Sequence, residues 1–86
     1  MNINQLIEIV EKKILSQDCI LKVKIEDKSF LHKTHKSNES GKFHILLSIV
    51  SPELKKKNKL YSTRFIYNIL DDELKNYIHS LQIKLI

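Results

Sequence analysis

Cysteine, glycine and proline each occur once in this 86-residue sequence, and tryptophan does not occur at all. The single cysteine, Cys19, excludes an intramolecular disulfide and a CxxC redox or metal motif, and a reducing compartment is its simplest setting. One glycine cannot build a glycine-rich loop that cradles phosphate groups. Because helix and strand breakers are so few, we expect most of the chain to lie in regular elements.

Long apolar segments are also missing. No run approaches the roughly 20 apolar residues that a membrane-spanning helix needs. Residues 1–13 mix charged and apolar side chains and lack the hydrophobic region of a signal peptide. We therefore expect a cytoplasmic protein without membrane association.

Acidic residues are outnumbered: 15 Lys and Arg stand against 10 Asp and Glu, for a net charge of +5. All the basic residues except Arg64 are lysines. A basic balance permits contact with nucleic acid or with an acidic protein partner, without choosing between them. The excess of lysine, isoleucine and asparagine fits a biased genomic base composition equally well.

The length of 86 residues predicts a single domain over residues 1–86. A chain this short buries only about 60% of the surface that its unfolded form exposes. A hydrophobic fraction of 42% is enough for one core, and no repeat or linker divides the chain.

Catalytic motifs are absent. The sequence has no Ser-His-Asp spacing, no G-x-S-x-G and no Walker loop. Asp71 and Asp72 are adjacent, so their side chains diverge at a helix start, and we interpret them as part of a cap. We expect a non-enzymatic protein without a small-molecule substrate.

The first half of the chain changes its hydrophobic period twice. Apolar residues recur at helical spacing over residues 3–15, and Asn2 with Gln5 has the pattern of a capping box. Apolar and polar residues then alternate over residues 19–26 and again over 42–50, which predicts two strands.

A polar stretch over residues 27–41 separates the two strands and predicts a long loop, which in a compact domain is more often functional than decorative. Pro52 ends the second strand. The elements expected after it are a turn or early helix over residues 53–59, a helix over 60–70, a helix from 71 to about 81, and a strand over 81–85. The order α-β-β-α-α-β predicts an α+β fold, with a three-stranded mixed sheet and helices packed on one face.

The pattern also predicts the core. We expect the buried face of the sheet to carry Leu21, Val23, Ile25, Phe43, Ile45, Leu47, Ile83 and Leu85. The helical residues expected to pack on it are Ile7, Val10, Ile66, Leu70, Leu74 and Ile78. We expect Cys19 to be a small buried apolar residue.

The four histidines are His32, His35, His44 and His79, and imidazole suits iron, zinc and copper. An HxxH pair such as His32 and His35, without cysteine or acidic partners, is a weak metal signal, and from the sequence alone solvated loop side chains are the favoured interpretation. His79 lies at the end of the predicted apolar helix, where a helix-capping or core role is the default interpretation.

A basic cluster opens the second half of the chain. Its members are Lys55, Lys56, Lys57, Lys59 and Arg64. They could form the phosphate-contacting edge of a helix-turn-helix, or simply a solvated basic face. The backbone-clamping G-x-x-G loop of KH domains is absent, and acidic residues 71–73 stand where a recognition helix would begin.

Several segments together resemble the BolA family over nearly the whole chain. Ile78-His79-Ser80-Leu81 is similar to the family's V/I-H-A-L motif, and His32-Lys33-Thr34-His35 is similar to its HxGH loop. The other matching segments are Lys24–Ser29, Asn38–Ser40 with Phe43–Ile45, Val50–Pro52, Arg64–Tyr67 and Asp72–Leu74. The resemblance implies a variant of the class II KH fold. The basic stretch departs from the family, because Ser62-Thr63-Arg64 keeps only the last Arg of its R-H-R motif.

The resemblance also implies a function. BolA-like proteins bind monothiol glutaredoxins, and the pair can share a [2Fe–2S] cluster with glutathione in iron–sulfur, iron and redox handling. The positions that match the family's cluster ligands are His79 and His32, with His35 as an alternate, and no cluster is expected on the protein alone. Iron accepts imidazole beside thiolate, as Rieske centres show. Some BolA-like proteins are transcriptional regulators in stress response, so DNA binding through residues 55–64 is the alternative.

Overall fold

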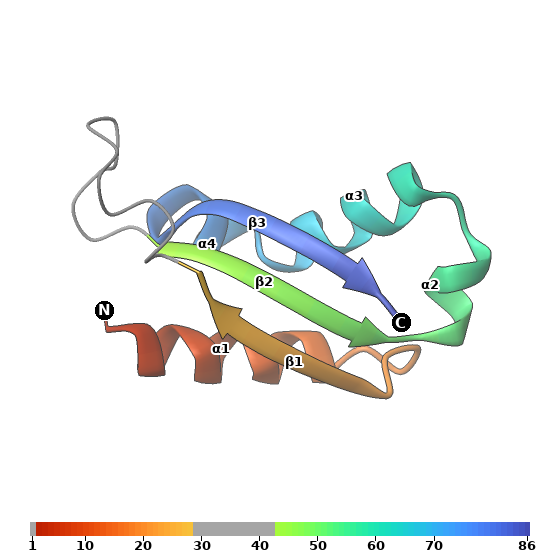
Figure 1. Cartoon of the computed structure of the whole chain (residues 1–86), viewed down its shortest axis with the longest axis horizontal. Coiled ribbons are helices and arrows are strands. Elements are labelled where there is room, and N and C mark those ends of the chain that lie inside the picture. The colour runs from red at the N-terminus through yellow and green to blue at the C-terminus, as the bar shows by residue number, and fades with distance from the viewer. Residues whose placement is uncertain (1, 29–42) are drawn as a thin grey trace.

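The computed structural model describes residues 2–28 and 43–86. Most of the predicted 27–41 loop, with His32 and His35, lies outside the described residues. The elements are α1 (Ile3–Leu15), β1 (Lys22–Asp27), β2 (Phe43–Val50), α2 (Pro52–Lys56), α3 (Lys59–Ile69), α4 (Asp71–Asn76) and β3 (Ile78–Leu85) (Figure 1). The predicted order is confirmed, and α2 forms where the sequence indicated a turn or early helix.

The three strands form one mixed sheet in the order β1-β2-β3. The central strand β2 pairs antiparallel with β1 and parallel with β3. The parallel pair is connected through α2, α3 and α4. In the view of Figure 1, α1 and α4 lie behind the strands, and α2 lies beyond the end of β2. This arrangement confirms the predicted α+β fold and brings the end of β1 and the beginnings of β2 and β3 to the same end of the molecule.

Helix α1 begins where the capping box predicts. The Asn2 Oδ1 accepts a hydrogen bond from the Gln5 backbone N–H at 2.9 Å, and the Gln5 Oε1 accepts one from the Asn2 N–H at 3.1 Å. These bonds satisfy donors that have no partner within the helix. One face of the helix is buried, through Leu6, Val10 and Ile14.

The core lies between the sheet and the helices. Its buried residues are Leu6, Val10, Ile14, Ile20, Ile45, Leu47, Ile49, Leu54, Ile66, Leu70, Ile78 and Leu81. In β2 the predicted phase is confirmed, because Ile45 and Leu47 are 2% and 0% exposed. The prediction for Leu21 is wrong: its side chain is 63% exposed, because Ile20, one residue earlier, fills the core before β1 begins.

The boundary of the last strand is the second correction. The sequence predicted a helix up to residue 81, whereas α4 ends at Asn76 and β3 begins at Ile78. The pairing of β2 with β3 shifts in register, so that Phe43 stands opposite Ile78 and His44 opposite Ser80. The extra residue puts Ile78 and Leu81, spaced by three, on the same buried face, which imitates helical spacing. Among the described residues, no helix is long and apolar enough to cross a membrane.

Candidate functional site

His79 is an exposed residue in a β-bulge near the beginning of β3. The sequence placed it at the end of a helix, and the structure corrects this, since α4 ends before Tyr77. His79 is the residue left over where the register shifts from the Phe43–Ile78 pair to the His44–Ser80 pair. A bulge of this kind redirects a side chain, and here it brings the His79 ring next to the ring of His44.

The two imidazole rings touch edge to face. Their centroids are 5.0 Å apart and their planes are inclined by 64°. His44 lies in the central strand and is only 3% exposed, so it is a buried polar residue beside an exposed one. Its Nδ1 shares a hydrogen bond of 2.7 Å with the Oγ of Ser80.

Sequence reasoning counted His44 among the histidines but assigned it no role. The alternation over residues 42–50 predicted that the side chain of His44 lies on the face of the strand opposite to that of Ile45. The missing information was the register of a parallel pair whose partner residues lie 35 or 36 positions apart, such as 43 with 78 and 44 with 80. No local pattern reports that register.

The end of the sheet that carries His79 also carries both flanks of the undescribed segment 29–42. The Lys28 backbone N–H donates to the His44 carbonyl oxygen at 2.7 Å, and the Phe43 N–H donates to the Tyr77 carbonyl at 2.9 Å. Strand β1 neighbours β2 and not β3, so the segment begins one strand away from His79. The assignment of His32 or His35 as a second ligand stays a prediction, because both residues lie outside the described part.

The described residues do not complete a metal site by themselves. Within residues 2–28 and 43–86, no group of three or more His, Cys, Asp or Glu side chains could hold a metal ion. Cys19 is half-buried near the start of β1, at the other end of the sheet from His79. A metal held at His79 would therefore need donors from elsewhere, and thiolates of a partner suit iron beside imidazole.

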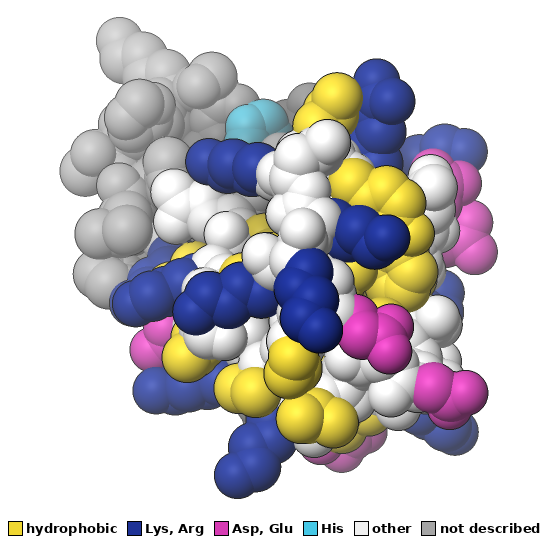
Figure 2. All heavy atoms as spheres, turned by 90° about the vertical axis from the view of Figure 1, so that its right-hand side faces the viewer, with side chains coloured by type: hydrophobic (Ala, Val, Ile, Leu, Met, Phe, Trp, Pro, Cys, Tyr) yellow, Lys and Arg dark blue, Asp and Glu magenta, His cyan; other side chains and the backbone are white. Residues whose placement is uncertain are grey.

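The basic cluster lies at the opposite end of the molecule from His79. Its side chains belong to α2, to α3 and to the turn between them, and all are exposed: Lys55, Lys56, Lys57, Lys59 and Arg64. Figure 2 shows this end, where Lys and Arg side chains stand among apolar and acidic ones. Residues 54–70 contain no acidic side chain, so the positive charge is not neutralised within this segment.

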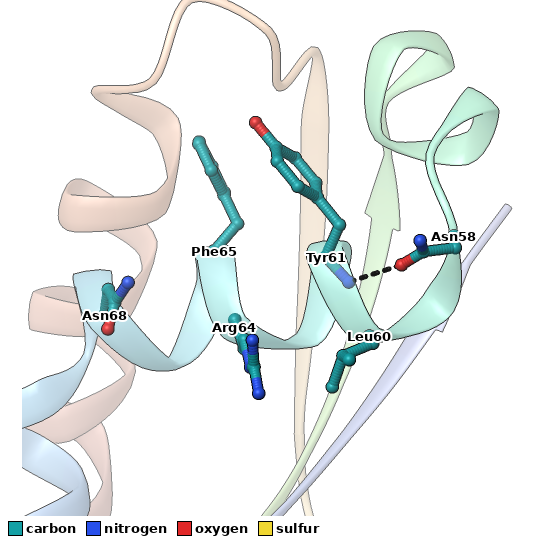
Figure 3. A pocket seen from close by; sticks show the side chains of 6 residues that line it. All are labelled: Asn58, Leu60, Tyr61, Arg64, Phe65 and Asn68. Atoms are coloured by element: carbon teal, nitrogen blue, oxygen red, sulfur yellow. Dashed lines mark hydrogen bonds between the residues drawn. The ribbon is translucent and has the colours of Figure 1, made fainter.

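An aromatic pair adjoins the basic cluster. The rings of Tyr61 and Phe65 stack at 6.4 Å, and the Lys57 Nζ lies 5.4 Å from the centre of the Tyr61 ring. Tyr61 is 48% exposed, so it is a surface residue and not part of the core. In Figure 3 Tyr61 and Phe65 point to one side of α3, and Leu60 and Arg64 to another.

The lengths and charges of α3 and α4 do not support a helix-turn-helix in which α4 is the recognition helix. α4 has 6 residues, and its first turn carries Asp71, Asp72 and Glu73. Negative charge at this position repels phosphate. α3 is longer, with 11 residues, and Asn58 caps its N-terminus, where the Asn58 Oδ1 accepts from the Tyr61 N–H at 2.8 Å. The exposed side chains of the basic cluster are carried by α2, by α3 and by the turn between them, and none by α4.

Comparison with known proteins gives a consistent family. Residues 16–86 match the family model described as BolA-like protein. The DNA-binding transcriptional regulator BolA of Haemophilus influenzae is 33% identical over 78 residues, which cover 91% of this chain and 73% of that protein. SufE-like protein 1, chloroplastic/mitochondrial, of Arabidopsis thaliana is 34% identical over 68 residues, which cover 73% of this chain but only 18% of that protein.

Solved structures have the same fold. The BolA domain of SufE1 from Arabidopsis thaliana superposes with a TM-score of 0.76 at 27% identity, covering 99% of this chain and 92% of that one. A bol-like protein from Babesia bovis has a TM-score of 0.68 at 22% identity, with coverage of 92% and 80%. At that identity the second likeness concerns the fold alone.

Proposed function

Since this chain belongs to the BolA-like protein family, we propose that it is a non-enzymatic partner of a monothiol glutaredoxin. The two proteins share a [2Fe–2S] cluster in iron–sulfur, iron and redox handling. The observation that carries the proposal is the placement of His79: an exposed imidazole on a strand, in a bulge, beside a second imidazole. A capping or core histidine would not need this exposure.

The metal-ligating side chains of this chain support a cluster site shared with a partner protein rather than one that is complete within this chain. His79 supplies one imidazole nitrogen, and His32, or His35 in its place, supplies the second donor. Glutaredoxin and glutathione supply the thiolates. When the cluster is bound, each neutral imidazole that replaces an anionic thiolate raises its reduction potential.

The test combines this protein with a cluster-loaded monothiol glutaredoxin and glutathione, and records visible absorption and circular dichroism. His79→Ala should change both spectra and make the cluster more labile. Its melting curve should stay that of the wild type, because the side chain is exposed. Gln82→Ala, another exposed position of β3, is the matched control and should change neither.

His32→Ala should have a weaker effect than His79→Ala, because His35 can substitute. A His79→Ala protein that folds and gives an unchanged shared-cluster spectrum would rule out the ligand assignment. Unfolding of this variant would instead mean that the ring has a structural role.

DNA binding is the second candidate function. The charged, acid-free segment 54–70 favours it, as does the similarity to a relative whose name includes DNA-binding transcriptional regulator. We propose that the contact, if it occurs, uses Lys55, Lys56, Lys57, Lys59 and Arg64. Because these residues lie at the other end of the molecule from His79, the two functions need not exclude each other.

A salt titration of DNA binding by the lone protein tests this candidate. The observed affinity should fall steeply with salt, and each Lys→Gln change in the basic cluster should reduce the slope by about 1. Lys12→Gln in α1 is a control at an exposed lysine outside the cluster. If Lys12→Gln reduced the DNA affinity and the salt slope as much as the changes in the basic cluster do, DNA binding would not be confined to the basic cluster.

We also propose that residues 1–86 act as one domain and that the protein is cytoplasmic. The first rests on the single core and on the family match over residues 16–86. The second rests on the single cysteine, which suits a reducing compartment.

A further inference from the structure

An exposed histidine is a poor ligand unless something restrains it. A side chain in solvent samples several rotamers, and ordering it on binding costs conformational entropy. A site that binds well has its ligand rings held by neighbouring groups before the ligand arrives. His79 is exposed, so the residues that could restrain its ring are those in contact with it.

His44 is such a neighbour, and it is itself well anchored. It lies in the central strand, with 3% of its surface exposed. Its backbone carbonyl accepts a hydrogen bond from the Lys28 N–H at 2.7 Å. Its ring cannot turn freely, because Nδ1 shares a 2.7 Å hydrogen bond with the Ser80 Oγ.

Ser80 is the residue directly after His79 and stands opposite His44 in the sheet register. The hydrogen bond therefore joins β2 to β3 immediately beside the bulge. His79 lies between this hydrogen bond and the first residue of β3, and its ring centroid is 5.0 Å from that of His44. The anchored ring limits the directions in which the His79 ring can rotate.

From this geometry we infer that His44, locked by Ser80, is a positioning residue that holds the His79 imidazole in the orientation that binds the shared cluster. This inference rests on the proposed function. His44 acts through His79, and no bond from His44 to a metal is part of it.

The hydrogen bond that restrains the His44 ring depends on the hydroxyl of Ser80, which is a feature of this sequence. The V/I-H-A-L motif has alanine at the corresponding position, and alanine has no group that could bond the His44 ring. Ser80→Ala therefore removes one oxygen atom and leaves the backbone, the bulge and both imidazoles in place. This small change tests the tie with little risk to folding.

The first measurement uses the free protein and needs no metal. Three-bond couplings between the Hα and Hβ protons of His79 report its χ1 rotamer by NMR. In the wild type we expect one dominant rotamer, and in Ser80→Ala and His44→Phe we expect values closer to rotamer averaging. Ser80→Thr keeps a hydroxyl and should restore the wild-type couplings. Ser48→Ala, which removes a serine on the same side of β2 as His44, is the matched control and should change nothing.

The second measurement uses the complex with cluster-loaded monothiol glutaredoxin and glutathione. Ser80→Ala and His44→Phe should alter the visible circular dichroism and shorten the lifetime of the cluster by about 10-fold or more, because removing a group that orients a metal ligand typically costs about 10–100-fold in metal affinity. Ser80→Thr should recover the wild-type values. Melting curves show which variants fold. If His44→Phe does not fold, the result for Ser80→Ala alone tests the positioning role.

The possible failures are distinguishable. If His79→Ala changes the shared-cluster spectrum but Ser80→Ala leaves both the couplings and the spectrum unchanged, the positioning role is wrong and the proposed function stands. If His79→Ala itself has no effect on the spectrum, the ligand assignment fails and the positioning role falls with it.

Discussion

The Lys13 Nζ on α1 donates hydrogen bonds of 2.9 and 2.8 Å to both carboxylate oxygens of Glu73 on α4. The Glu73 side chain is only 7% exposed, whereas that of Lys13 is 38% exposed. The pair ties the first helix to the last across 60 positions of sequence. It also neutralises a buried carboxylate that would otherwise be costly to bury.

Lys13→Met should destabilise the protein by about 1–3 kcal/mol, because Glu73 is left buried without its partner. The partial exposure of Lys13 keeps the expected loss below that of a fully buried pair. Urea unfolding measures it. Lys75→Met is the matched control, since its pair with Asp71 is exposed on both sides and should contribute little. Equal effects of the two variants would contradict the role given to Glu73.

The same pair predicts a pH dependence. The hydrogen bond to Glu73 raises the pKa of Lys13 above its ordinary 10.5. The stabilising contribution is then fully present below pH 10.5, the pKa of the unfolded chain, and is lost as the pH rises through the higher folded value. The difference in unfolding free energy between wild type and Lys13→Met should stay constant from neutral pH up to about pH 10 and shrink above it. A difference that grew with alkaline pH would contradict the assignment.

Ile45→Ala should cost about 2–5 kcal/mol, because Ile45 is 2% exposed in the central strand and its truncation leaves a cavity. In a domain of this size that is much of the total stability. Leu21→Ala, at a side chain that is 63% exposed, should change the unfolding free energy by less than about 0.5 kcal/mol. A similarly small loss for Ile45→Ala would mean that the strand phase is wrong.

Ser51→Ala should cost about 1–2 kcal/mol, because one fully buried hydroxyl makes two bonds. Its Oγ donates to the Cys19 carbonyl at 2.7 Å and accepts from the Leu54 N–H at 3.2 Å, where it caps α2. Ser16→Ala removes an exposed hydroxyl that donates to the Lys13 carbonyl, and it should cost clearly less in the same chemical denaturation experiment. Equal losses would show that burial of Ser51 adds nothing.

The protein purified alone should carry no [2Fe–2S] cluster. Within the described residues no group of three or more ligating side chains comes together, so most of the iron coordination would be unfilled. The absorption spectrum of the protein, prepared under anaerobic conditions with iron and sulfide but without glutaredoxin or another thiol, checks this. A stable brown monomer would overturn it and would require a ligand set complete within this chain.

Local patterns in the sequence were enough for a large part of the fold. The capping box of Asn2 and Gln5 placed the start of α1, because its two hydrogen bonds join residues only three positions apart. The alternation around Ile45 and Leu47 placed the buried face of β2, since the side-chain period of a strand is read within a few residues. The segments that resemble the BolA family likewise identified the fold and His79 as a candidate.

The errors arose where distant segments decide a local structure. Ile78 and Leu81 are spaced like residues on a helix, and only pairing with β2 makes them a bulged strand, with Phe43 opposite Ile78. Leu21 continued an alternating pattern, but Ile20 took its place in the core.

Local sequence patterns were thus sufficient to predict the type and order of the elements, the phase of the central strand, and the residue types from which a site could be made. The tertiary structure alone decided that His44 meets His79, that Ser80 holds His44, and that Lys13 reaches Glu73. The physical reason is that hydrophobic periodicity reports which face of an element is buried, whereas strand register and helix packing depend on contacts between residues far apart in the chain.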